Sequence, residues 1–217
     1  MLKNGFEGDS LSLMVLYLVP ARKAREALPD SVEVEEVMPG MTVGCLYASR
    51  YGMGEGFVSE LGIAPAFVHS EERKGFYLSR LLSNGTSGIC GQGCDTSTVF
   101  CWQNERKTVA LSVSSGGQEI VSLRIGARQI NVPVVTTVPF LMANEIGSGE
   151  IPVYRAHHLR EFQLASVRVS VPAGSPLAAL PSSYKLVSII WEPGEVAVWE
   201  PRQAESRMSA KPRIIEV

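Results

Sequence analysis

The sequence lacks any apolar run long enough to cross a membrane, and it lacks the features of a secretory signal. A transmembrane helix needs about 20 consecutive apolar residues, and no stretch approaches that length. The apolar residues 11–19 follow Glu7 and Asp9, and no small-x-small cleavage site comes after them, which is not typical of a signal peptide. We therefore expect a soluble, cytoplasmic protein with no membrane partner.

Clusters of like charge are also missing. The 20 basic and 22 acidic side chains are spread along the chain and give a formal charge of -2, so no basic surface for nucleic acid is expected. The hydrophobic content of 45% with 19% charged residues is typical of a packed globule. It also favours a homo-oligomer that buries apolar surface, with a well-filled monomer as the alternative. A length of 217 residues suits one domain.

Cysteine and histidine are scarce, and their spacing does not indicate a metal site. The four cysteines are Cys45, Cys90, Cys94 and Cys101, and their Cys-x3-Cys-x6-Cys spacing differs from the usual Cys-x2-Cys metal motifs. In a chain without a signal they are more simply reduced thiols. Adjacent His157 and His158 would point to opposite faces of a strand, and His69 falls in a loop-like stretch. We expect no metal and no cofactor.

Strand patterns dominate the chain, and no βαβ rhythm or internal repeat is visible. The expected fold class is mainly β, an antiparallel sheet curled into a barrel with minor helices. A short helix over 21–28 follows Pro20 and is stopped by Pro29. The expected strands cover 10–18, 32–35, 42–47, 76–82, 107–113, 118–125, 132–144 with an edge or bulge at its prolines, 151–155, 162–171, and a final β pair of 184–191 and 195–199, before a loose tail at 202–217.

Residues 76–102 form the most site-like stretch. After a strand come four glycines, three of the four cysteines and a series of hydroxyls, and glycine lets backbone approach a ligand closely. In the strand, Tyr77, Ser79 and Leu81 should share one face and Leu78 and Arg80 the other. Arg80 could bind a carboxylate from inside a barrel or could reach water. No lysine occurs between Lys74 and Lys107.

Glu60 stands among apolar neighbours after the glycine-rich loop expected at 51–56. A carboxylate in that setting is salt-bridged, solvent-facing or part of a pocket. The first two alternatives are favoured by the sequence alone, because charged side chains are seldom buried without a partner.

The order of these features resembles the acetoacetate decarboxylase superfamily. The matching segments are Ala27-Leu-Pro29, Phe57-Val-Ser-Glu60, Gly75-Phe-Tyr-Leu78, Gly-Gln-Gly at 91–93, and Val-Pro-Ala-Gly-Ser-Pro-Leu at 171–177 before a strand pair. The resemblance implies a mainly antiparallel barrel with an interior pocket, assembly into oligomers, and a small keto acid as substrate. The family's decarboxylases use a pocket lysine that forms a Schiff base with a β-keto acid. The match also raises the expectation that Glu60 is a pocket residue.

This chain departs from the family at its reactive positions. One alignment places Thr98-Val99 at the family's Pro-Lys pair and another places Asp95-Thr96 there, so neither offers an amine. The family's first pocket carboxylate falls at Cys45 and the arginine of its first strand near Ser10. Glu60 is thus the candidate catalytic residue, and the pocket expected from the resemblance contains Cys45, Tyr77, Arg80, Gln92, Cys94, Asp95, Thr96 and Thr98.

Three functions remain open from the sequence. The first is a pocket for a small organic or keto acid without Schiff-base chemistry. The second is a lyase, hydratase or isomerase with Glu60 as general acid or base, with Cys94 as a nucleophile in a weaker variant. The third is an interaction protein that kept only the fold.

Overall fold

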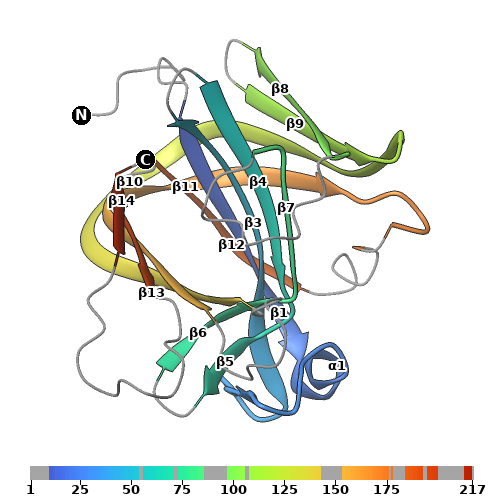
Figure 1. Ribbon diagram of the computed structural model, residues 1–217, viewed down its shortest axis with the longest axis vertical. Helices are drawn as coiled ribbons and strands as arrows, with labels where there is room; N and C mark the ends of the chain where they lie inside the picture. Colours follow the sequence, from blue (N-terminus) through green and yellow to red (C-terminus); the bar gives the residue numbers. More distant parts are fainter. Residues whose placement is uncertain are drawn as a thin grey trace.

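The computed structural model describes residues 10–53, 56–70, 73–85, 97–105, 108–142, 153–175, 177, 184–192, 195–199 and 213–216. These residues form a mainly β structure with one short helix, as expected (Figure 1). The elements are β1 (Leu11–Pro20), α1 (Ala21–Arg25), β2 (Glu33–Val34), β3 (Met41–Met53), β4 (Gly56–Ala64), β5 (Phe67–Ser70), β6 (Arg73–Leu78), β7 (Arg80–Ser83), β8 (Val99–Glu105), β9 (Thr108–Ser115), β10 (Gln118–Met142), β11 (Val153–Ser170), β12 (Tyr184–Trp191), β13 (Glu195–Trp199) and β14 (Arg213–Glu216).

The fourteen strands of the described residues belong to one sheet. Its main path runs β2-β5-β6-β10-β11-β12-β1-β3-β4-β7, with β9 and β8 added beside β10, and β13 and β14 added beside β11. Neighbouring strands pair antiparallel except β10 with β6. The path among the described residues is open, since its two ends, β2 and β7, are not paired with each other.

Strand β1 lies in the middle of this path and is buried on both faces, as its dense apolar sequence predicts. Leu13 and Val15 belong to one core cluster, and Met14 belongs to another. We call these the first and second core clusters. The first is the larger and also receives β9, the start of β10 and Ala24 of α1. The second gathers aromatic and apolar side chains of β3, β6, β10 and β12.

The hairpin of β9 and β10 is confirmed. Its two central residues, Gly116 and Gly117, have φ angles of 58° and 80°, the left-handed region that a two-residue hairpin turn needs and glycine adopts readily. Ser115 and Gln118 close the ladder on either side. The Ser-Ser-Gly-Gly sequence was therefore sufficient to predict this turn.

Two segments near the candidate site differ from expectation. The predicted loop at 51–56 is instead the end of a hairpin, because Tyr51, Gly52 and Met53 continue β3, and Met53 pairs with Gly56. The predicted strand 76–82 is broken at Ser79 into β6 and β7. A one-residue break shifts the alternation of side chains, so residues on either side of it no longer share the expected face.

Three predictions about the C-terminal half are wrong. The two strands expected at 118–125 and 132–144 are one strand, 118–142, with register shifts in the 125–130 segment and after Pro133, where a bulge was expected. Strands β12 and β13 do not form a hairpin. Ile190 pairs with Gln163 and Trp199 with Tyr154, so both strands run alongside β11 in one continuous register. The end of the presumed tail is strand β14, paired with β13.

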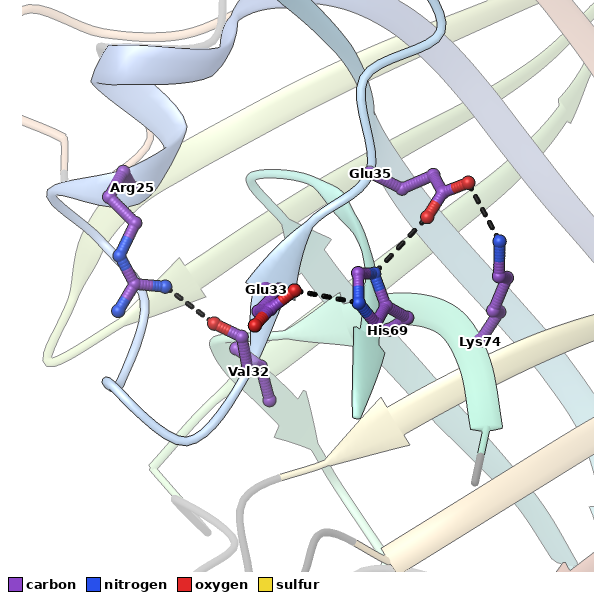
Figure 2. A network of polar contacts seen from close by, with 6 residues as sticks. All are labelled: Arg25, Val32, Glu33, Glu35, His69 and Lys74. Carbon is purple, nitrogen blue, oxygen red and sulfur yellow. Dashed lines mark hydrogen bonds and ion pairs between the residues drawn. The ribbon is translucent and has the colours of Figure 1, made fainter. Parts of the chain in front are cut away.

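Helix α1 begins after Pro20, as expected, and ends at Arg25, earlier than predicted. Within the described residues no helix is long and apolar enough to cross a membrane. Arg25 donates from Nη1 to the carbonyl oxygen of Val32 at 2.6 Å, which anchors the segment between α1 and β2 (Figure 2).

A surface network joins β2 to β5 and β6 (Figure 2). His69 lies in β5 rather than in a loop, and its Nε2 and Nδ1 atoms are 2.8 Å and 3.2 Å from carboxylate oxygens of Glu33 and Glu35. Lys74 donates to Glu35 at 2.7 Å. That hydrogen bond is the largest cause that holds the pKa of Glu35 below its usual value.

Candidate functional site

Glu60 is completely buried in β4. The Tyr51 hydroxyl, on the neighbouring strand β3, donates a hydrogen bond to Glu60 Oε1 at 2.9 Å, and Tyr51 is itself only 1% exposed. The solvent-facing alternative is therefore wrong. A buried carboxylate is costly unless hydrogen bonds stabilise it, and this phenol supplies one.

A row of small hydroxyl side chains flanks Glu60. Ser49 of β3 and Ser83 of β7 lie directly opposite it on the two neighbouring strands, and Ser12 of β1 lies opposite Ser49. Directly paired residues point to the same face of a sheet, so the four side chains form one polar row across β1, β3, β4 and β7. All of them are 1% exposed or less.

Two hydrogen bonds involve the serines of this row. The Oγ atoms of Ser12 and Ser49 are 2.7 Å apart, and Ser83 Oγ accepts from the backbone N–H of Gly85 at 3.2 Å. A serine hydroxyl both donates and accepts. The row can therefore hold a carboxylate and can also offer donors and acceptors to a polar ligand.

The polar row shares its face of the sheet with the second core cluster. Tyr47 belongs to that cluster and lies two residues from Ser49 on β3, so both point the same way. The Tyr47 ring lies 5.1 Å from the ring of Phe140 and 5.4 Å from that of His157, centroid to centroid. Trp191 stacks on Tyr47 at 6.3 Å. Aromatic side chains thus lie next to the polar row.

Among the expected pocket residues, Cys45 shares this face and Tyr77 does not. Cys45 belongs to the second core cluster, and burial raises the pKa of its thiol far above the usual value. Tyr77 packs in the first core cluster, while its neighbours Phe76 and Leu78 pack in the second. Burial raises the pKa of Tyr77 as well. Tyr77 and Glu60 therefore lie on opposite faces of the sheet.

The other expected residues are dispersed or lie outside the described residues. Arg80 is exposed at the start of β7, which agrees with the water-facing alternative. Thr98 is buried just before β8, and its hydroxyl has no hydrogen-bond partner among the described residues. Gln92, Cys94, Asp95 and Thr96 lie outside the described residues.

No lysine is buried in the part of the chain that the structure describes. Lys23, Lys74 and Lys185 are all exposed, and Lys3, Lys107 and Lys211 fall outside that part. No group of three metal-ligating side chains was found within the described ranges either.

Sequence reasoning missed Tyr51, the three serines and His157. His157 is 3% exposed and His158 is exposed, as the opposite-face prediction requires. The signal for Tyr51 was the alternation Cys45-x-Tyr47-x-Ser49-x-Tyr51, which places four polar or polarisable side chains on one face of a strand. The glycines after Tyr51 led to the prediction of a loop there instead.

Comparison with known proteins identifies the fold. No protein-family model and no curated protein sequence matches the chain. Among solved structures, acetoacetate decarboxylase from Legionella pneumophila is similar with a TM-score of 0.58 and 14% identity over 88% of each chain. The chain thus has the acetoacetate decarboxylase fold, and the resemblance seen in the sequence is confirmed at that level.

Solved structures of two further proteins share the fold. The enduracididine biosynthesis enzyme MppR, with HEPES buffer bound, has a TM-score of 0.56 and 13% identity over 83% of this chain and 80% of that one. MppR is also known in complex with pyruvate, at the same TM-score and identity. An acetoacetate decarboxylase-like enzyme from Sphingomonas wittichii RW1 has a TM-score of 0.51 and 9% identity over 83% and 86%.

Proposed function

We propose that this chain is an acetoacetate decarboxylase-like protein that binds a small organic acid or keto acid beside Glu60 and does not act through a Schiff-base lysine. The observation that carries the proposal is the fully buried Glu60, held by Tyr51 in a row of hydroxyls on this fold. Pyruvate, the keto acid bound to MppR, makes keto acids the first ligands to test.

The exposed lysines support the absence of Schiff-base chemistry. An amine needs a lowered pKa to attack a carbonyl near neutral pH, and burial or a neighbouring cation usually provides it. Lys23, Lys74 and Lys185 are exposed and lack such burial. The segment at the family's lysine position, residues 86–99, contains no lysine at all.

We further infer that the sheet closes into a barrel through the bent strand formed by β6 and β7. One residue, Ser79, separates them, and β6 pairs with β10 while β7 pairs with β4. Around the break the backbone N–H groups of Tyr77 and Ser79 donate to the carbonyl oxygens of Ala66 and Ile63 at 3.1 Å and 2.9 Å. These bonds tie the region around the break to β4 and to the residue just before β5.

Glu60 should weaken the binding of an acid beside it. A keto acid is an anion near neutral pH, and placing it beside a carboxylate brings two negative charges together. Replacing the carboxylate with a neutral amide of similar shape should therefore raise the affinity for the anion.

Titration calorimetry with pyruvate and acetoacetate at pH 7 tests this. Glu60→Gln should bind the keto acid about tenfold more tightly than the wild type does. Glu119→Gln, at an exposed position of β10, is the matched control. Binding that Glu60→Gln leaves unchanged would contradict the placement of the ligand.

A second candidate is a lyase, hydratase or isomerase in which Glu60 moves the proton. The Tyr51 hydroxyl favours it, because a phenol aimed at a buried carboxylate can orient that group for proton transfer. Turnover of a keto acid that is lost in Glu60→Gln, while ligand binding persists, would select this candidate. Treatment with borohydride and substrate should leave the mass of the protein unchanged under either candidate function, because neither forms a Schiff base.

A further inference from the structure

Edge strands present unpaired backbone groups, and natural proteins usually protect them with charge, proline, bulges or short length. Most edge strands in the described part of this sheet have at least one of these protections. The end strand β2 has two residues and includes Glu33, and β7 has four and begins with Arg80. Strand β14 carries Arg213 and Glu216, and the exposed middle of β10 is interrupted at Pro133.

Strand β8 has one of these protections, the charged residue Glu105 at its end. It pairs with β9 alone among the described strands and lies on the outside of the β8–β9 ribbon (Figure 1). Its seven residues contain no proline, and no charged residue precedes Glu105. The register with β9 runs unbroken from Val99 opposite Ser114 to Glu105 opposite Thr108. From Val99 to Asn104 the edge is therefore regular and neutral.

The strand is also held firmly in place. Phe100 and Trp102 pack against the first core cluster, and Trp102 Nε1 donates to Ser59 Oγ at 3.1 Å. The opposite face presents Val99, which is 64% exposed, and the exposed Cys101. A pre-ordered strand loses little conformational entropy when another strand pairs with it.

We propose that β8 pairs edge to edge with β8 of a second copy of this chain, antiparallel about a two-fold axis, and forms a homodimer interface. This surface is separate from Glu60 and does not depend on the proposed ligand. A two-fold axis gives the antiparallel orientation and makes the contact self-complementary. Because residues 99–104 are uncharged, a second β8 places few like charges opposite one another, which suits self-pairing.

Sedimentation velocity of the full chain under reducing conditions, from low to high micromolar concentration at physiological salt, tests the proposal. The wild type should be a dimer that dissociates on dilution. The variant Val99→Lys/Cys101→Lys places four ammonium groups at the paired edges and should raise the dissociation constant about tenfold or more. The matched control, Ile130→Lys/Val135→Lys, adds the same charge at exposed positions of β10 and should leave assembly unchanged.

Amide exchange supplies a second measurement that does not depend on a variant. Exchange from residues 99–105 should slow as protein concentration rises, while exchange in 41–53 stays constant. A monomer at every concentration, an assembly that the β8 variant leaves intact, or equal disruption by the control variant would each overturn the proposal.

Discussion

At the scale of single residues, the pair of Glu60 and Tyr51 is the feature that most constrains function. A carboxylate without exposed surface is rare in proteins, and here it accepts a hydrogen bond from a phenol that is almost as deeply buried. Burial of both groups makes their hydrogen bond matter for stability as well as for chemistry.

Replacing Tyr51 with phenylalanine should destabilise the protein by about 1–3 kcal/mol, because the buried carboxylate loses a donor and gains no water in exchange. Urea denaturation at pH 7 measures the loss. The control is Tyr184→Phe, whose side chain is 78% exposed and should be neutral. Equal stability of the Tyr51 variant and the wild type would mean that this hydrogen bond contributes nothing to folding.

Tyr17 predicts how stability depends on alkaline pH. Burial, with a smaller contribution from Cys45, raises the pKa of Tyr17 to about 12, whereas an unfolded tyrosine has a pKa of about 10. Between these values the unfolded chain has lost the proton and the folded chain retains it. The free energy of unfolding should therefore fall as pH rises from about 10 towards 12.

The variant Tyr17→Phe should flatten this part of the pH profile, measured by denaturation at several pH values. Burial also raises the pKa of Tyr77, so the difference between the variant and the wild type is the informative quantity. Identical slopes for the two proteins would show that Tyr17 does not retain its proton in the folded state.

At the scale of elements, turns with glycine were predictable and strand partners were not. The β9–β10 hairpin depends on two glycines with positive φ. Adjacent glycines between two strand patterns are visible in the sequence, so this turn could be predicted locally. Strands β12 and β13 depend on β11, which is distant in the chain. Pro193-Gly194 suggested a hairpin between the two strands. That prediction was wrong because a local turn signal carries no information about a distant partner strand.

Gly117→Ala should cost about 1 kcal/mol, since its φ of 80° strains any residue with a Cβ atom. Chemical denaturation measures the change. Gly52→Ala is the control, because a Cβ atom at Gly52 meets nothing within 4 Å and its φ is not positive. A loss of stability in the control as large as that at Gly117 would mean that the turn conformation is not the cause.

At the scale of the whole molecule, the sheet separates two core clusters, and Glu60 lies with the second of them. The break at Ser79 determines which side chains reach each cluster. Before it, Phe76 and Leu78 face the second cluster, and after it Leu81 does. An uninterrupted strand would have placed Tyr77 beside Leu81, as the alternation in the sequence predicted.

The proposed closure of the sheet predicts slow exchange at its corner. If β6 and β7 close a barrel, the amides of Tyr77 and Ser79, bonded to Ala66 and Ile63, should exchange only with global unfolding. Native-state hydrogen exchange in low denaturant measures this, with the amides of Leu13 and Val15 in the middle of the sheet as the reference. Exchange at Tyr77 through a smaller, local opening would indicate an open corner.

Composition and local patterns by themselves determined the class of this protein. Apolar alternation, glycine turns and the scarcity of helix signals were enough to predict a mainly β chain, and short motifs in order were enough to indicate the acetoacetate decarboxylase fold. They also made Glu60 a candidate, because a carboxylate stands out in an apolar strand. Each of these features can be read within a few residues.

The tertiary structure alone decided the surroundings of Glu60. Ser12, Ser49 and Ser83 come from three other strands, and only the register between strands places them in one row with the carboxylate. The single break at Ser79 moved Tyr77 to the other face. Register and strand order arise from contacts between distant segments, and a one-residue shift in either exchanges the two faces of a strand.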